Sequence, residues 1–294
     1  MNIDLRVTGK TRLLGLIGNP VEHSISPQLH NSLSLLNGLD LVYIPLKVEK
    51  ENLEVVVKAL KALDFVGFNV TIPYKRDIMK FIDDNTKEAI LMGSVNTIKK
   101  IEGRLYGYNT DGEGFLRAFK EAAGMGFKGK KVVVIGAGGV ARPIAVKIAM
   151  DGAEKISIVN RTTQKSVELA EVINENVAEI VQVYNSEDKT LKMAFEESDI
   201  IINTTSVGMS PDIDNSPVAD ADYFRSGQIV YDVVYNPAKT KLLADAESRG
   251  CKTIGGLGML FYQGINAYEI WTGVKISEES LKGIYNSFVK ILNK

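Results

Sequence analysis

The stretch GFNVTIPYKRD, at residues 67–77, places three polar side chains at the end of an apolar run. Asn69 and Thr71 alternate with apolar residues in the run, and Lys75 follows shortly after Pro73. An amide and a hydroxyl can bind the hydroxyl groups of a ligand, and an ammonium can give a proton to a developing alkoxide. The stretch therefore predicts a site for a polyhydroxylated ligand, with Lys75 in proton chemistry. The alternative is the ordinary polar end of a strand.

Polar residues of the same kinds recur at the ends of other expected strands or in turns of the first half. The set comprises Ser24, Ser26, Asn69, Thr71, Lys75, Asn96 and Asp111. Because the carboxyl ends of strands line the ligand crevice of an open α/β sheet, the set predicts a small substrate with hydroxyl groups and a carboxylate. Structural alternatives exist. Ser26 would be a helix N-cap, Asp111 would cap the helix from Gly112, and Lys75 would be a surface lysine.

A glycine-rich turn follows an unbroken apolar strand in the second half of the chain. The strand is expected at residues 131–135, and the turn Gly136-Ala137-Gly138-Gly139-Val140-Ala141 fits the pattern G-x-G-x-x-G/A. Such glycines let backbone N–H groups approach a pyrophosphate at the N-terminus of a helix. Pro143 agrees with a helix that begins near Gly139, because proline costs little in a first helical turn. This context predicts nucleotide binding.

The residues that follow the next strand favour NADP over NAD. NAD sites of this kind place an Asp or Glu about 20 residues beyond the first glycine, where it binds the ribose hydroxyls. Here the chain reads Asn160-Arg161-Thr162, followed by Lys165, with no carboxylate among them. Arg161 and Lys165 could pair with a 2′-phosphate, and Thr162 could donate a hydrogen bond to it. A solvated basic pair at a strand end is the alternative.

The order of the expected elements predicts an α/β fold with two domains. Strands and helices alternate, which is typical of mostly parallel sheets covered on both faces. The expected strands are residues 12–18, 41–48, 66–72, 131–135, 156–159, 180–183, 200–203, 229–234 and 253–254, with a hairpin at Glu102-Gly103. The expected helices are residues 26–37, 51–63, 78–82, 88–92, 112–123, 260–271 and 278–292, with one more after the glycine turn. The helix at 112–123 is expected to link the two halves.

The composition excludes several classes of protein. The 35 basic and 36 acidic residues of the 294-residue chain give a net charge of −1, which provides no footprint for nucleic acid. We expect no membrane span, since the sequence has no apolar run of about 18 residues, and no signal peptide. With a single cysteine, a reducing cytoplasm is the expected location. One cysteine, Cys251, excludes an intrachain disulfide, and with only two histidines we expect no metal site.

A series of motifs resembles the shikimate dehydrogenase family. In the first half they are S-x-S-P at 24–27, N-V-T-x-P-x-K at 69–75, G-S-V-N-T at 93–97 and G-x-N-T-D-G at 107–112. In the second half they are GAGGVAR at 136–142, NRTxxK at 160–165, NTTSVGM at 203–209, YDVVYNP at 231–237 and GGLGMLFYQG at 255–264. The motifs occur in order over nearly the whole chain.

The resemblance implies the reversible NADPH-dependent reduction of 3-dehydroshikimate to shikimate, in the pathway to chorismate and the aromatic amino acids. It implies a substrate-binding and catalytic domain at residues 1–111, completed by C-terminal helices at about 260–294 that pack back on it. It implies a Rossmann-type doubly wound NADP-binding domain at residues 112–259. The alternative is a dual-specificity quinate/shikimate dehydrogenase that uses NAD or NADP. The extra hydroxyl of quinate would crowd Ser24, Ser26 and Thr71.

The resemblance also implies a role for each matched residue. Lys75 and Asp111 would be the catalytic pair, which also contacts substrate. The further substrate-binding residues would be Ser24 and Ser26 for the carboxylate, and Asn69, Thr71, Asn96 and Gln263 for ring hydroxyls, with Tyr235 nearby. The cofactor-binding residues would be Gly136, Ala137, Gly138, Gly139, Asn160, Arg161, Thr162, Lys165, Thr205, Ser206, Val233, Gly256 and Met259.

Two residues depart from the family pattern. Ser94 stands where alanine is commoner, and Lys165 stands where arginine is often found. Lysine binds phosphate as a point charge rather than as a planar fork, so the preference for NADP could be weaker here. The expected partners are shikimate and 3-dehydroshikimate, and the expected assembly is a monomer or a homodimer.

Overall fold

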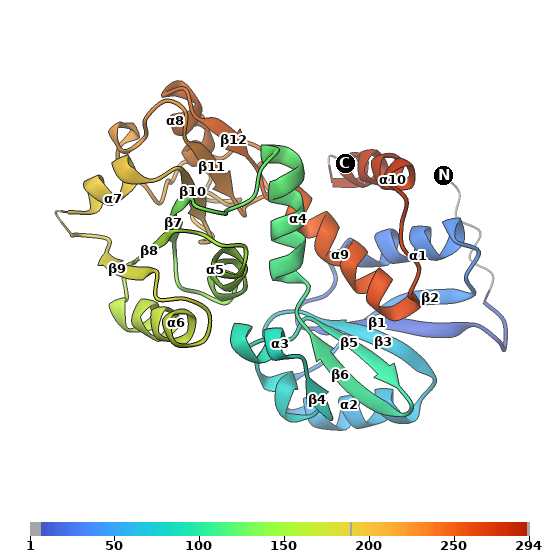
Figure 1. Ribbon diagram of the computed structural model, residues 1–294. Coiled ribbons are helices and arrows are strands. Elements are labelled where there is room, and N and C mark those ends of the chain that lie inside the picture. Colours follow the sequence, from blue (N-terminus) through green and yellow to red (C-terminus); the bar gives the residue numbers. More distant parts are fainter. Residues whose placement is uncertain (1–6, 189, 293–294) are drawn as a thin grey trace. The chain divides into compact units, whose positions relative to one another are not determined.

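The computed structural model describes residues 7–188 and 190–292 (Figure 1). The chain divides into two compact units. Unit 1 comprises residues 1–110 and 263–294, and unit 2 comprises residues 111–262. Within the described residues each unit contains a six-stranded sheet with helices against it, which confirms the predicted two-sheet α/β architecture.

Unit 1 has a mixed sheet with the strand order β2-β1-β3-β5-β6-β4. Its strands are β1 (Arg12–Gly18), β2 (Leu41–Lys47), β3 (Phe65–Val70), β4 (Asp84–Asn85), β5 (Thr97–Ile101) and β6 (Arg104–Tyr108). Its helices are α1 (Ser26–Leu36), α2 (Leu53–Ala62), α3 (Lys87–Met92), α10 (Glu278–Leu292) and, from Gln263 on, α9 (Leu257–Thr272), with short 3₁₀ turns at Lys50–Asn52 and Asp77–Lys80. β1 pairs in parallel with β2 and β3, and the predicted hairpin joins the antiparallel β5 and β6.

Helix α9 packs on one face of this sheet, and α2 lies on the other (Figure 1). Helix α10 lies beside α1 in the same unit, so the C-terminal helices pack back on this domain as predicted. Gly67 of β3 makes the close contact with α9 possible. The indole nitrogen of Trp271 donates to the backbone oxygen of Ile98 at 2.8 Å, and a Cβ atom at residue 67 would lie 2.4 Å from that nitrogen. A larger residue at position 67 would displace the indole from the sheet.

Unit 2 has a parallel sheet with the strand order β12-β11-β10-β7-β8-β9. Its strands are β7 (Lys131–Ile135), β8 (Lys155–Asn160), β9 (Val181–Asn185), β10 (Ile200–Asn203), β11 (Ile229–Asp232) and β12 (Lys252–Ile254). Its helices are α4 (Asp111–Ala123), α5 (Ala141–Met150), α6 (Thr163–Asn176), α7 (Leu191–Glu197) and α8 (Lys241–Ser248), with a 3₁₀ turn at Ala221–Tyr223. The order reverses direction between β7 and β10, as in a doubly wound dinucleotide-binding sheet.

The central strands of unit 2 are buried on both faces, which explains their unbroken apolar sequences. Helices α7 and α8 bury Phe195 and Leu242 against one face, beside Val230. Phe115 of α4 meets the ring of Tyr231, the neighbour of Val230 in β11, in an edge contact at 5.0 Å. Successive residues of a strand point to opposite faces, so helices cover both sides of this sheet.

Several element boundaries differ from the prediction. Helix α5 begins at Ala141 rather than near Gly139. The helix expected at 78–82 is a 3₁₀ turn at Asp77–Lys80, in which one buried side chain, Ile78, anchors a segment too short for an α-helix. Within the part of the chain that the structure describes, no helix is long and apolar enough to cross a membrane.

Candidate active site

The segment that carries Thr71 and Lys75 is held in unit 1 by backbone hydrogen bonds. The N–H of Thr71, just beyond β3, donates to the oxygen of Ile17 at 2.9 Å. The oxygen of Lys75 accepts from the N–H of Val95 at 2.8 Å. The lysine is half-buried. These bonds fix the backbone position of Lys75, the candidate proton donor. They also place Lys75 beside Val95, the residue directly before Asn96.

Asn69 and Asn96 lie in one buried hydrogen-bond network. Asn69 is 6% exposed and Asn96 is 2% exposed. Asn69 Nδ2 donates to the backbone oxygen of Asn96 and to Oγ1 of Thr97, both at 3.0 Å. Asn96 Nδ2 donates to Oγ1 of Thr110 at 3.0 Å, and Asn96 Oδ1 accepts from the N–H of Thr110 at 2.7 Å. Sequence reasoning missed Thr97 and Thr110, although both flank predicted site residues.

Ser94 has a structural role that accounts for its departure from the family pattern. Its Oγ accepts a hydrogen bond from Asn109 Nδ2 at 2.9 Å, and its backbone oxygen accepts from the same nitrogen at 3.0 Å. An alanine at position 94 would keep only the backbone contact. The serine therefore gives Asn109, two residues before Asp111, a second anchor.

The interpretation of Ser26 as a helix N-cap is wrong. Ser26 is the first residue of α1, the cap residue is Ile25, and no described side chain makes the capping bond. The N–H of Ser26 donates instead to Oγ of Ser24 at 3.3 Å. Pro27 in the first turn lacks an N–H group and so reduces the need for a cap. The Ser26 hydroxyl is therefore not consumed by capping.

The two candidate catalytic residues belong to different compact units. Lys75 lies in unit 1, whereas Asp111 is the first residue of α4 in unit 2 and is 7% exposed. Of the remaining candidate substrate residues, Gln263 is half-buried in unit 1 and Tyr235 is exposed in unit 2. The convergence of Lys75 and Asp111 stays a prediction.

The three glycines of the turn after β7 have different surroundings. Gly136 has a φ of +104°, and a Cβ atom there would lie 2.7 Å from Thr204 Oγ1 and 2.9 Å from Thr205 Cγ2. Gly138 and Gly139 are exposed, and a Cβ atom on either would have no described atom within 4 Å. Gly136 is therefore required for the turn itself. Gly138 and Gly139 keep open a surface that a pyrophosphate could approach.

The basic residues after β8 surround the N-terminus of α6. Arg161, Thr162 and Lys165 are all exposed. Asn160 Nδ2 donates to the oxygen of Thr162 at 2.9 Å, and Asn185 Nδ2 donates to the oxygen of Arg161 at 3.3 Å, which together hold the loop. The first turn of α6 contains no acidic residue. Two cations at the positive end of a helix repel each other and its dipole, so the site fits an anion such as a phosphate.

A buried carboxylate organises the predicted nicotinamide side of unit 2. Asp232, 0% exposed, accepts hydrogen bonds from Asn203 Nδ2 at 2.9 Å and from Thr240 Oγ1 at 2.7 Å. Burial raises the pKa of Asp232, and these hydrogen bonds lower it in part. Asn203 Oδ1 accepts from the N–H and the hydroxyl of Thr205 at 2.9 and 2.7 Å. Asn203 and Asp232 are the last residues of the neighbouring strands β10 and β11, and they pair in register. Two polar residues at the ends of adjacent strands were the feature of the sequence from which this network could have been predicted.

Close packing explains the glycine at position 256. A Cβ atom there would lie 2.0 Å from the backbone oxygen of Val233. Val233 in turn donates from its N–H to the oxygen of Asn203 at 3.0 Å. Among the other predicted residues of this group, Met259 is 8% exposed and Ser206 is exposed. Unit 2 thus brings Thr205, Val233 and Gly256 to one end of the sheet.

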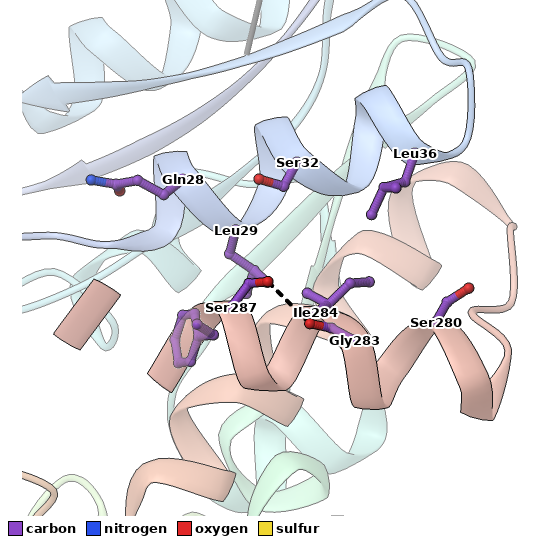
Figure 2. A pocket seen from close by; sticks show the side chains of 9 residues that line it. Gln28, Leu29, Ser32, Leu36, Ser280, Gly283, Ile284 and Ser287 are labelled. Carbon is purple, nitrogen blue, oxygen red and sulfur yellow. Dashed lines mark hydrogen bonds between the residues drawn. The ribbon is translucent and has the colours of Figure 1, made fainter. Parts of the chain in front are cut away.

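A separate cavity of about 270 Å³ lies between α1 and α10 (Figure 2). It is lined by Gln28, Leu29, Ser32, Leu36, Ser280, Gly283, Ile284, Ser287 and Phe288. None of these described lining residues is charged, and none is a candidate site residue. Ser287 donates its hydroxyl to the oxygen of Gly283 within its own helix. The cavity therefore lacks the groups that would bind an anionic, hydroxylated substrate.

Family models match the chain in three consecutive segments. Residues 16–98 match the shikimate dehydrogenase substrate binding domain. Residues 118–234 match the shikimate/quinate 5-dehydrogenase domain, and residues 256–282 match the shikimate 5′-dehydrogenase C-terminal domain. The first segment lies in unit 1, and the second lies in unit 2.

Similar proteins cover nearly the whole chain. A relative from Methanocaldococcus jannaschii named shikimate dehydrogenase (NADP(+)) is 45% identical over 94% of this chain and 96% of its own. A crystal structure of a shikimate dehydrogenase in complex with NADP⁺ is 44% identical, with a TM-score of 0.87 over 96% of this chain and 97% of that one. The shikimate 5-dehydrogenase of Listeria monocytogenes, solved with shikimate and NAD, is 41% identical, with a TM-score of 0.91 over 95% and 98%. This chain therefore belongs to the shikimate dehydrogenase family.

Proposed function

We propose that this protein catalyses the reversible NADPH-dependent reduction of 3-dehydroshikimate to shikimate. The observation that carries the proposal is the buried amide and hydroxyl network of Asn69 and Asn96 in the unit that also holds Lys75. Such a network suits a small hydroxylated ligand, because it presents polar groups in fixed orientations. The names of the relatives support the same substrate and cofactor. Of the similar crystal structures, the complex with NADP⁺ supports the cofactor, and the Listeria structure, which holds shikimate and NAD, supports the substrate.

Unit 1 would bind the substrate. Ser24 and Ser26, at the start of α1, would hold the carboxylate, since the hydroxyl of Ser26 is not used to cap the helix. The ring hydroxyls would be held by Asn69, Thr71, Asn96 and Gln263. Tyr235 would lie nearby. Hydroxyl and amide groups can donate hydrogen bonds to a carboxylate, and they can donate to or accept from a hydroxyl.

Lys75 and Asp111 would perform the proton chemistry. NADPH, when bound, supplies the hydride that reduces the ring ketone. Negative charge develops on the ketone oxygen, and Lys75 as an ammonium would stabilise that charge and donate the proton that completes the hydroxyl. Asp111 would orient the ammonium group and the adjacent hydroxyl of the substrate. The same groups would act in reverse when shikimate is oxidised.

Unit 2 would bind the cofactor, and its residues fit that role. The open surface at Gly138 and Gly139 would admit the pyrophosphate against the N-terminus of α5, with Gly136 and Ala137 forming the turn. Arg161 and Lys165, with Asn160 and Thr162, would bind the adenosine 2′-phosphate. The end of the sheet at Thr205, Ser206, Val233, Gly256 and Met259 would line the nicotinamide side.

The proposal favours shikimate over a dual quinate/shikimate specificity. The relative from Methanocaldococcus jannaschii is named shikimate dehydrogenase (NADP(+)). A quinate dehydrogenase in complex with NAD is a more distant neighbour, 30% identical with a TM-score of 0.87. Since quinate carries one more hydroxyl beside its carboxylate, it would crowd Ser24, Ser26 and Thr71.

A two-by-two assay tests substrate and cofactor together. The purified protein is incubated with shikimate or quinate and with NADP⁺ or NAD⁺, and formation of the reduced cofactor is followed by absorbance. We expect the highest kcat/KM for shikimate with NADP⁺. Equal rates with quinate would contradict the substrate assignment, equal rates with NAD⁺ would contradict the cofactor assignment, and inactivity with all four pairs would contradict the enzyme itself. We further propose that the protein acts in the cytoplasm as a monomer or a homodimer. Light scattering of the purified protein measures its oligomeric state.

A further inference from the structure

A buried tyrosine reaches across the sheet of unit 1 to a candidate substrate residue. Tyr43 of β2 is 2% exposed, and its hydroxyl donates to Asn69 Oδ1 at 2.8 Å. Strand β1 lies between β2 and β3, so the side chain passes over β1 to make this bond. Tyr43 is in register with Leu14, and Leu14 with Gly67, two residues before Asn69. All four side-chain positions therefore share the face of the sheet on which Trp271 packs.

The other hydrogen bonds of Asn69 fix which way its amide group points. Both donors of Nδ2 are used, one by the backbone oxygen of Asn96 and one by Oγ1 of Thr97. A flipped amide would turn Oδ1 toward the Asn96 oxygen and replace a donor with an acceptor there. Asn69 therefore presents Oδ1 toward Tyr43 and can offer a ligand only the remaining acceptor capacity of that oxygen.

The network continues from Asn69 toward the end of unit 1. The hydroxyl of Thr97 donates to Asn96 Oδ1 at 3.1 Å, and the same oxygen accepts from the N–H of Thr110 at 2.7 Å. A series of hydrogen bonds thus connects Tyr43 on β2 with the residue directly before Asp111. Its buried members depend on one another for their orientation, because each unpaired group in such a setting is costly.

The ring of Tyr43 is itself held tightly by its neighbours. The imidazole of His30 stacks on it with ring centroids 4.4 Å apart, and Trp271 lies at 6.1 Å. Ser26 lies against the hydroxyl: burial raises the pKa of Tyr43, and the side chain of Ser26 opposes that rise. The hydroxyl is therefore placed between two candidate substrate residues, Ser26 and Asn69.

We infer that Tyr43 is a positioning residue for substrate recognition, acting through Asn69. This inference rests on the proposed function, in which Asn69 binds a ring hydroxyl. The donated hydrogen bond of Tyr43 holds Asn69 Oδ1 where it accepts from that hydroxyl, and Tyr43 itself does not touch the substrate. Loss of this hydrogen bond therefore lowers the affinity for the substrate and leaves the rate of the chemical step nearly unchanged.

The experiment compares Tyr43→Phe, Asn69→Ala and the double variant in the full-length protein. Tyr43→Phe should raise the KM for shikimate about 3- to 10-fold, the loss expected for one neutral hydrogen bond, while kcat and the KM for NADP⁺ stay nearly unchanged. The fluorescence of Trp271, the only tryptophan of the chain, gives the dissociation constant of shikimate independently. In the Asn69→Ala background, Tyr43→Phe should have no further effect, because the two residues act as one unit.

Tyr268→Phe is the matched control. Tyr268 belongs to the same aromatic cluster, 6.3 Å from the ring of His30, but its hydroxyl lies near Ser34 and Asn37. This variant should keep the wild-type KM.

If Asn69→Ala raises the KM and Tyr43→Phe does not, or if their effects add, the inference is overturned and the proposed function stands. If Asn69→Ala leaves the KM unchanged, the proposed role of Asn69 falls, and the inference falls with it. Thermal unfolding of each variant separates a loss of folding from a loss of binding.

Discussion

The two units present their candidate site residues in different ways. In unit 1, Asn69 and Asn96 are almost fully buried and joined by hydrogen bonds to their neighbours. In unit 2, Arg161 and Lys165 are exposed, and Gly138 and Gly139 face open space. A small substrate must be distinguished by the placement of each hydroxyl, which requires oriented groups. A dinucleotide can be bound largely by backbone N–H groups and by flexible charges.

Removal of the candidate proton donor should have the largest effect. Lys75→Ala should lower kcat by about 10²- to 10⁴-fold, the usual contribution of a positioned general acid, with little change in the KM for shikimate. Lys80→Ala is the control, because Lys80 is an exposed lysine on the adjacent 3₁₀ turn and pairs with Asp77 at 3.8 Å. Steady-state kinetics of both variants measures this. Unchanged turnover in Lys75→Ala would exclude Lys75 from the chemistry.

The buried aromatic cluster of unit 1 should make the protein sensitive to acid. Burial lowers the pKa of His30 from 6.5 to about 3. The unfolded state therefore binds more protons than the folded state between these values, and stability present above pH 6.5 is lost as the pH falls toward 3. Once the unfolded histidine is protonated, the expected loss is about 1.4 kcal/mol per pH unit. The neighbouring Tyr43 and Tyr268 have pKa values raised by burial and stay neutral in this range.

Urea unfolding as a function of pH measures this contribution. His30→Phe keeps an aromatic ring between Tyr43 and Trp271 but has no titrating group there. The part of the change in unfolding free energy with pH that His30 contributes should therefore be absent from this variant. The buried Asp232 of unit 2 contributes with the opposite sign: its pKa is raised, so its protonation favours the folded state at low pH. Identical pH slopes for the wild type and His30→Phe would show that the pKa of His30 is the same in the folded and unfolded states, and would contradict this prediction.

Loss of one exposed cation in unit 2 should weaken cofactor discrimination. Arg161→Ala should raise the KM for NADP⁺ about tenfold, as expected for one charge-assisted contact that solvent partly screens, and leave the KM for NAD⁺ unchanged. The effect should shrink in high salt. Lys192→Ala, an exposed lysine of α7, should change neither value. Equal increases with both cofactors would place Arg161 away from the 2′-phosphate.

Two glycines of one turn should separate folding from binding. Gly138→Ala should leave the melting temperature unchanged, because its Cβ atom meets no described atom within 4 Å, and should raise the KM for NADP⁺ about fivefold by obstructing the pyrophosphate. Gly136→Ala should lower the melting temperature, because of its φ of +104° and the contact with Thr204 Oγ1. Calorimetry and kinetics on the pair measure both quantities. A lower melting temperature in Gly138→Ala would contradict the open surface.

Local patterns predicted most elements of the fold correctly. The apolar run at Lys131–Ile135 was predicted as a strand with these bounds, because a strand buried on both faces has no polar alternation to obscure its ends. The hairpin at Glu102-Gly103 was also predicted, and both residues have the positive φ that such a turn needs. The short 3₁₀ turn at Asp77–Lys80 was predicted as a longer helix, because apolar spacing over a few residues does not distinguish the two.

The candidate site was only partly accessible from sequence. Asn69, Asn96 and Arg161 were predicted as candidates because they stand at strand ends within recognisable motifs, and their roles stay predictions. Tyr43 was missed, because it looks like an ordinary apolar strand residue, and Asp232 was missed although it ends a strand. The sequence around Tyr43 and Asp232 shows no motif or periodicity that would identify the partners of their polar atoms.

By itself the sequence determined the α/β class, the glycine turn, the basic residues beyond it and membership of the family, since these depend on neighbours along the chain. Only the tertiary structure decided that Tyr43 donates to Asn69, 26 residues away, and that Trp271 donates to Ile98, 173 residues away. The physical reason is that a buried polar group must find its partner in the packed interior. That partner is set by sheet order and helix placement, which no local pattern specifies.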